Sequence, residues 1–339
     1  MNHIVKRIAI LSGVFAAALG VFFFANNRWN SGQDQAVYMD MEAASLPSVT
    51  VQMLDRDMNR LYGYRQEMNT TAAGETLTIL PEDRALTVRI TEGTVTGISY
   101  EVRSMDRERL VERTEVSDWW QTDDGILAVL PIQNLLTKER EYQLKIQLDT
   151  ENFGPVYYYT RILWTDAADN ARAMVDLAAD FSMKTFDYEQ ARSLTTYLET
   201  SPSEDNSTFG HTSIHSSFSQ LTWGKLDMQP EANVEIHLKE LDGVMCGIQL
   251  SYQAKRGTEI YEVEEDFTMK WNELRIYMMQ YDRTVNQIFS GDRSEYSGKR
   301  ILLGITGDDR VELVKSAGGK VLAYRVNRDL WSYDPADRR

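Results

Sequence analysis

Two histidines four residues apart are the first candidates for chemistry, because an i, i+4 pair on a helix can bind one metal ion. His211 and His215 lie in the stretch FGHTSIHSS, whose Gly, Ser and Thr content indicates a loop that enters a strand. On a strand, residues four positions apart are separated by about 13 Å, which is too far for one ion. Of the other residues only His237 could assist, so we assign no metal ligand and no cofactor.

Serines near that histidine pair suggest the chemistry of a serine hydrolase; they are Ser213, Ser216, Ser217 and Ser219. A nucleophilic serine lies on a sharp elbow between small residues, as in G-x-S-x-G, or beside a fixed base, as in S-x-x-K. Neither pattern occurs in the sequence, and it contains no glycine-rich phosphate-binding loop. No serine is therefore assigned a catalytic role.

A run of acidic residues could supply the carboxylate pair of a glycosidase; its members are Glu262, Glu264, Glu265 and Asp266. Apolar and acidic residues alternate from Tyr261 to Glu264, which is typical of a strand with one polar face. We therefore predict that the glutamates form the solvated face of a strand, and assign them no catalytic role.

Two aromatic clusters could stack on sugar rings. They are Tyr157, Tyr158 and Tyr159, and the pair Trp119 and Trp120. Packing in the core or on the face of a strand explains both clusters better than a carbohydrate-binding platform does. The sequence thus contains no assigned catalytic, cofactor-binding or metal-binding residue.

The element that decides where such residues act is the apolar run 8–25, which follows Lys6 and Arg7. As a helix it would be about 27 Å long, close to the thickness of a bilayer's hydrocarbon core. The basic pair keeps the N-terminus cytoplasmic. Phe23, at position −3 of a cut after Ala25, makes a poor cleavage site, so we predict a signal anchor over 1–28 and a stalk over 29–47. A cleaved signal peptide is the alternative.

The net charge and the cysteine content limit which partners and which cellular compartment are plausible. The net charge of −15 argues against nucleic acid and anionic lipid. Cys246 is the single cysteine, so no internal disulfide can form. An exported chain without disulfides fits a bacterial cell surface.

Residues 48–165 predict an antiparallel β-sandwich, because short alternating segments are separated by Gly, Pro and Asp. The expected strands are 49–53, 77–79, 86–90, 95–102, 111–116, 126–132, 142–148 and 156–164. Leu135 and Leu136 precede Tyr142, which opens one of these strands. Over 45–165 this resembles the tyrosine corner of immunoglobulin-like and fibronectin type III sandwiches, and the resemblance implies a structural role for Tyr142. The chain departs from antibody domains in lacking a Cys pair and in placing Trp119 and Trp120 after a strand.

Residues 166–292 predict an α+β domain. Apolar residues at helical spacing indicate a helix over 168–181, capped by Asp166 or Asp169, and a second helix over 188–198. Expected strands follow at 214–226, 233–241, 244–255 and 259–279, with a hairpin turn at Asp242 and Gly243. This order resembles the cone-shaped nuclear-transport-factor-like fold, although a cystatin-like sheet fits nearly as well. No residue role is carried over from either.

Residues 293–339 predict a β-meander with strands at 300–305, 311–314, 320–325 and 330–334, which resembles one blade of a β-propeller. One blade cannot bury both of its faces. We therefore expect either that the chain continues past Arg339 with further blades, or that the segment packs on the α+β domain. In the second case the residues expected in its core are Leu302, Leu313, Leu322 and Leu330.

The sequence thus predicts a mainly β protein with an N-terminal transmembrane helix, an immunoglobulin-like sandwich, an α+β domain and a blade-like segment. We expect a single-pass membrane protein with a cytoplasmic N-terminus. Its extracytoplasmic part would be a non-enzymatic interaction, sensor or scaffold module of the bacterial cell envelope, with a protein or cell-wall partner. The alternatives are an envelope hydrolase acting on glycan or peptide, and a sugar- or solute-binding receptor. A convergent acidic or histidine cluster lining a pocket in the α+β domain would favour the enzyme, and an exposed aromatic patch would favour the binder.

Overall fold

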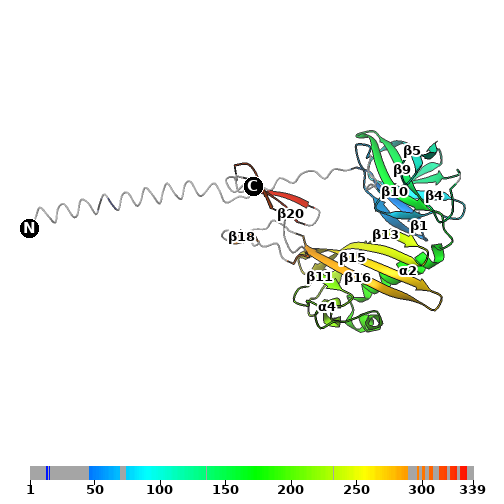
Figure 1. Cartoon of the computed structure of the whole chain (residues 1–339). Coiled ribbons are helices and arrows are strands. Elements are labelled where there is room, and N and C mark those ends of the chain that lie inside the picture. The colour runs from blue at the N-terminus through cyan, green and yellow to red at the C-terminus, as the bar shows by residue number, and fades with distance from the viewer. Residues whose placement is uncertain are drawn as a thin grey trace, which may run out of the picture. The chain divides into compact units, whose positions relative to one another are not determined.

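The computed structural model is mainly β, with several antiparallel sheets and few helices (Figure 1). The chain divides into two units, of which the first is Ala44–Asp309 and the second is Met1–Ala43 together with Arg310–Arg339. The residues that it describes are 13, 15, 46–68, 74–134, 136–231, 233–288, 296–297, 300–301, 305–307, 313–318, 321–326 and 329–333.

The predicted membrane anchor, 8–25, lies outside the described residues except for Gly13 and Phe15, which are helical. Of the predicted stalk, only residues 46 and 47 are described. Within the part of the chain that the structure describes, no helix is both long and apolar enough to cross a membrane.

Two five-stranded sheets form the first half of the large unit. In spatial order, the strands of the first sheet are β2 (Arg56–Leu61), β1 (Ser48–Met53), β4 (Ala85–Thr91), β8 (Gly125–Pro131) and β7 (Trp119–Thr122). Those of the second are β3 (Leu77–Ile79), β10 (Gly154–Leu163), β9 (Glu141–Thr150), β5 (Val95–Ser104) and β6 (Leu110–Glu115). All pairs are antiparallel except β3 with β10. Every second side chain enters one shared hydrophobic core, so the residues between them point outward.

The eight strands expected in 48–165 are confirmed, and two strands were missed. β2 does not alternate regularly, because the buried Asn59 takes a left-handed conformation with φ 51°. β7 is a four-residue edge strand that contains Trp119 and Trp120. The expectation that these tryptophans follow a strand is therefore wrong.

The corner predicted at Tyr142 is confirmed. The Thr137 N–H donates to the Tyr142 hydroxyl at 3.1 Å, and the Tyr142 ring is buried at the start of β9. Because the tyrosine bonds back to the connection that precedes its own strand, it holds the chain where it crosses from the first sheet to the second.

The second half of the large unit places the helix α2 (Ala168–Lys184) against a six-stranded sheet. The sheet contains β11 (His211–Ser213), β16 (Arg275–Gln287), β15 (Glu259–Asn272), β14 (Met245–Arg256) and β12 (Gln229–Pro230), with β13 (Glu235–Asp242) also paired to β14. The helix α2 packs on β14 and β15, and Figure 1 shows it beside β15. The predicted apolar face of α2 is buried, and its Phe181 ring packs on Phe267 and Tyr281. Neither Asp166 nor Asp169 caps the helix, whose N-cap is Ala167, so that prediction is wrong.

Three further expectations for this half need correction. Residues 214–226 are not a strand, because the Ser217 side chain caps a short helix, α4 (Phe218–Leu221). Residues 259–279 are two strands, since the chain reverses between β15 and β16 at Glu273 and Leu274, where no Gly or Pro marks the turn. The helix expected at 188–198 is only α3 (Tyr188–Ala191), followed by the 3-10 helix η2 (Arg192–Thr196). The hairpin predicted at Asp242 and Gly243 is confirmed, although its two turn residues are Gly243, at φ 55°, and Val244, because Asp242 still pairs with Met245.

The C-terminal strands do not form the expected four-stranded blade among the described residues. β17 (Tyr296–Ser297) pairs with β18 (Arg300–Ile301), whereas β19 (Leu313–Lys315), β20 (Leu322–Val326) and β21 (Asp329–Tyr333) form a separate three-stranded sheet. Leu313 and Leu330 are 51% and 79% exposed, so neither is the core residue that the alternative expected. Leu322 is half-buried, and Leu302 lies outside the described residues.

The two halves of the large unit meet where β2 approaches β13. The buried Asn59 side chain accepts from the Leu238 N–H and donates to the Leu77 carbonyl, both at 2.8 Å. Beside it, Arg60 pairs with Glu235 at 2.7 Å. Asn59 thus satisfies a backbone donor at the irregular position of β13, where the register with β14 shifts after Leu238.

Candidate binding cleft

The outward face of the second sheet carries a cleft with a volume of about 410 Å³. The register of the strands determines which side chains form the floor of this cleft. Glu101 on β5 pairs with Lys145 on β9, which pairs with Tyr159 on β10, so these three side chains form one row. Arg103 and Gln143 form the next row on the same face. Alternation requires these positions to face away from the core, because their neighbours on each strand are buried.

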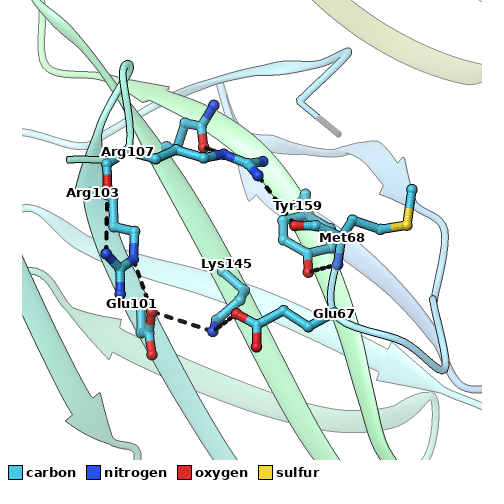
Figure 2. Close-up of a pocket in the computed structure, with 8 residues that line it drawn as sticks. Glu67, Met68, Glu101, Arg103, Arg107, Lys145 and Tyr159 are labelled. Carbon is cyan, nitrogen blue, oxygen red and sulfur yellow. Dashed lines mark hydrogen bonds and ion pairs between the residues drawn. The ribbon is translucent and has the colours of Figure 1, made fainter. Parts of the chain in front are cut away.

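One wall of the cleft is the segment 64–68, which runs over the sheet edge. Tyr64 exchanges two backbone hydrogen bonds of 2.9 Å with Tyr157. The Met68 N–H donates to the Tyr159 hydroxyl at 2.8 Å, and Lys145 pairs with Glu67 at 2.6 Å. Figure 2 shows Lys145 between Glu67 on this wall and Glu101 on the floor.

The opposite wall is formed by Arg107 at the turn after β5. Its guanidinium donates to the Met68 carbonyl at 3.1 Å and to Gln143 Oε1 at 2.5 Å (Figure 2). Arg107 therefore links the floor to the segment 64–68 and holds the Gln143 amide in a fixed orientation.

Two ionisable groups of the floor, Glu101 and Tyr159, keep their ordinary charge states at neutral pH. Desolvation by itself would raise the pKa of Glu101, but hydrogen bonds from Arg113 and Lys145 lower it on balance. Lys145 and Arg103 lie 3.2 and 3.1 Å from that carboxylate. Burial raises the pKa of Tyr159. Glu101 is thus ionised and Tyr159 protonated, and neither is tuned to exchange a proton near pH 7.

One polar atom of the floor has no partner. Gln143 is 9% exposed, and its Nε2 makes no hydrogen bond within the described part of the chain. The other amide atom, Oε1, is engaged by Arg107. A buried amide donor that lines a cleft is a ready position for a ligand acceptor.

The histidines singled out by the sequence do not converge. His211 lies at the exposed start of β11, with Nε2 3.3 Å from Asp282 Oδ1, whereas His215 Nδ1 lies 2.9 Å from the Glu199 carbonyl. Among the described residues, no group of three or more His, Cys, Asp or Glu side chains could hold a metal ion. The remaining histidine of that set is His237, whose Nε2 lies 3.7 Å from Glu235 Oε2. It precedes Leu238, the residue of β13 that Asn59 contacts.

The serines organise the turn between β11 and α4. Ser216 Oγ accepts from the Ser213 N–H at 2.9 Å, and Ser217 Oγ accepts from the Gln220 N–H at 3.2 Å. The Ser213 hydroxyl donates to Glu204 at 2.7 Å. These contacts are those of a turn and a helix cap.

The acidic run is split between two faces of β15, which corrects the prediction of a solvated glutamate face. Glu262 and Glu264 are half-buried and Asp266 is exposed, but Glu265 is fully buried. The Tyr281 hydroxyl donates to Glu265 at 2.7 Å, and desolvation raises the pKa of this carboxyl. The alternation that begins at Tyr261 already puts Glu265 on the apolar side.

The aromatic clusters lie on different sheets of the sandwich. Tyr158 is buried and donates to the Pro47 carbonyl, whereas Tyr157 and Tyr159 face outward near the cleft. Trp120 lies on β7, at an edge of the other sheet. The two clusters therefore do not form one platform.

Sequence reasoning missed Glu101, Arg103, Gln143 and Lys145 of the cleft floor, and it considered Tyr159 only as part of an aromatic cluster. A signal was present, because Glu101 and Arg103, and Gln143 and Lys145, occupy the outward positions of two predicted strands. That these strands are neighbours could not be read from their spacing in the chain, which is about forty residues.

Comparisons with models of protein families and with curated sequences give no match. One solved structure with partial similarity is a Cellulomonas fimi endo-beta-1,4-mannanase double mutant. It shares 13% identity over 25% of this chain and 15% of its own chain, with a TM-score of 0.18.

Proposed function

We propose that this chain is a single-pass membrane protein whose extracytoplasmic part is a non-enzymatic interaction or sensor module of the bacterial cell envelope. The observation that carries the proposal is the cleft on the second sheet. The pKa of Glu101 is lowered and that of Tyr159 is raised, so neither group is poised to exchange a proton near neutral pH, and the ion pairs and hydrogen bonds of the cleft offer groups for recognition.

The strand order supports an immunoglobulin-like or fibronectin type III-like assignment for 48–165. β1, β4, β8 and β7 follow the order of the A, B, E and D strands of such sandwiches, and β5, β9 and β10 that of C, F and G. Tyr142 then lies at the start of the F-like strand, after the E–F connection. Fold alone implies no function, so the proposal depends on the cleft.

Location rests on the apolar run 8–25 behind Lys6 and Arg7. The positive-inside rule keeps the short N-terminus in the cytoplasm, which sends the residues after the run across the membrane. A protein or a cell-wall component is then the partner within reach of the cleft.

A photocrosslinking experiment in cells tests this function. The photoreactive residue p-benzoylphenylalanine would replace Tyr64, which is partly exposed beside the cleft, or Trp120, a matched exposed aromatic on the other sheet. We expect a full-length membrane-bound protein with a discrete crosslinked product from position 64 and none from position 120.

Three results would overturn the proposal. The first is the absence of a product from position 64, and the second is an equal product from both positions. The third is a shortened protein that fractionates as freely soluble. Turnover of glycan or peptide by the purified chain would replace the proposal with the envelope hydrolase.

A further inference from the structure

We propose that the cleft binds a carboxylate group, and that Glu67 of the segment 64–68 occupies the position of that carboxylate in the unliganded chain. The inference deepens the proposed function and rests on it, because it names the chemistry that the same cleft recognises.

The charges of the cleft favour an anion. Its lining contains three cationic side chains, Arg103, Arg107 and Lys145, against two carboxylates, Glu67 and Glu101. The chain as a whole has a net charge of −15, so an excess of cations at one cleft is a local feature and not a property of the surface.

The two carboxylates differ in how firmly they are held. Glu101 is buried and is bound by Arg103, Arg113 and Lys145 at once. The Glu67 side chain is 58% exposed, and among the described residues its ion pair is with Lys145 alone. An exposed single ion pair contributes little to stability, so a ligand carboxylate can replace Glu67 without disturbing the floor.

Lys145 is placed to accept this exchange. Its side chain is 14% exposed and is held between Glu101 at 3.2 Å and Glu67 at 2.6 Å (Figure 2). If Glu67 moves away, Glu101 still neutralises part of the lysine charge, while the ammonium keeps a donor directed to the cleft.

Gln143 adds a second point of recognition. Its unpartnered Nε2 is a buried donor, and Arg107 fixes the opposite end of the amide. Gln143 and Lys145 are two residues apart on β9 and face the same way, so they lie about 7 Å apart along the strand. The matching ligand has a carboxylate and, at a second position along the strand direction, a hydrogen-bond acceptor. An extended peptide C-terminus and an oligomeric uronic acid both offer this pair of groups.

Isothermal titration calorimetry on the purified full-length chain tests the inference with three probes. They are acetyl-trialanine with a free carboxylate, the same peptide as its C-terminal amide, and digalacturonate. We expect at least one carboxylate probe to bind and the amide peptide to bind about tenfold more weakly or not at all. Peptide binding alone points to a protein terminus, and digalacturonate binding alone points to an acidic glycan. Either result supports the carboxylate site.

Variants separate the competing carboxylate from the recognition groups. Glu67→Gln should tighten binding of the carboxylate probe about threefold or more, because it removes the internal competitor. Gln143→Leu and Lys145→Met should weaken it about tenfold. The controls are Glu231→Gln and Lys255→Met, which should leave binding unchanged. Glu231 and Lys255 form an exposed ion pair of 3.2 Å, and Lys255 lies on β14 in the six-stranded sheet.

The decisive variant is Glu67→Gln, since its side chain is exposed and its loss leaves the floor intact. The inference is overturned if neither carboxylate probe binds the wild-type chain or this variant more tightly than the amide peptide does. It is also overturned if Glu67→Gln weakens binding. A crosslink from position 64 together with either result would leave the proposed function standing with another ligand chemistry.

Discussion

The cleft of the sandwich and the core of the α+β half contain the same kinds of side chain in opposite surroundings. On the sandwich, Glu101 and Lys145 face each other across β5 and β9 at the edge of solvent. In the core, Glu265 and Arg283 face each other across β15 and β16 and are fully buried. Their neighbours lower the pKa of Glu101, whereas desolvation raises that of Glu265.

The difference lies in what the basic residue does. Arg283 donates to the Gln220 and Leu221 carbonyls at 3.0 Å and stacks 3.7 Å above the Trp223 ring. It thereby fixes the end of α4 against the sheet, while Glu265 Oε2 and Arg283 Nε have no hydrogen-bond partner in the part of the chain that the structure describes. The buried cluster holds the fold in place. The cleft cluster contains an exposed carboxylate, Glu67, that can be exchanged.

The largest expected effect comes from the buried member of this comparison. Arg283→Met should reduce the free energy of unfolding by about 3–5 kcal/mol, because it leaves Glu265 without a nearby positive charge and two carbonyls without their donor. Adding Glu265→Leu should recover a large part of the loss. Arg113→Met, the matched change beside the cleft, should reduce it by less than about 1 kcal/mol. Urea denaturation measures all three, and equal losses for Arg283→Met and Arg113→Met would remove the distinction between the clusters.

The contact between the two halves predicts the next effect. Asn59→Ala should reduce the free energy of unfolding by about 2–3 kcal/mol, because the buried Leu238 N–H and Leu77 carbonyl lose their partners. We expect the unit 44–309 to unfold in one transition in the wild type and in two transitions in this variant. Calorimetry of the full chain shows whether it does. Gln249→Ala, at an exposed pair with Asp266, is the control and should keep one transition.

The corner tyrosine predicts a smaller change. Tyr142→Phe removes the hydroxyl that accepts from Thr137 and should reduce stability by about 1 kcal/mol. The control is Tyr277→Phe, at a partly exposed ring on β16. If the two variants have the same melting temperature, the corner hydrogen bond contributes nothing to the sandwich.

The two carboxyls should also give opposite pH dependences. The pKa of Glu101 is lowered on folding, so its stabilisation is present above the ordinary value of 4.5 and is lost as the pH falls below it. The pKa of Glu265 is raised, so stability is lost as the pH rises from 4.5 through the raised value. Relative to the wild type, Glu101→Gln should lose stability most above pH 4.5, and Glu265→Gln should gain stability as the pH rises. Denaturation curves between pH 3 and pH 8 test the signs, and slopes of the same sign would contradict the comparison.

The sequence by itself determined the repeating local features of this protein. Alternation located the eight predicted strands of the sandwich, helical spacing identified the buried face of α2, and Gly243 marked a hairpin. It also contained the corner at Tyr142, since the residues that bond there are five positions apart. These features depend on backbone geometry over a few residues, which the order of residue types expresses directly.

Tertiary structure alone decided which outward residues meet. Glu101, Lys145 and Tyr159 form one row only because β5, β9 and β10 are neighbours in one register. A shift of one residue would send each side chain to the opposite face. The same holds for Arg283, whose carbonyl partners lie more than sixty residues earlier. Strand order and register depend on the packing of the whole core, so neither cluster could be assembled from local sequence.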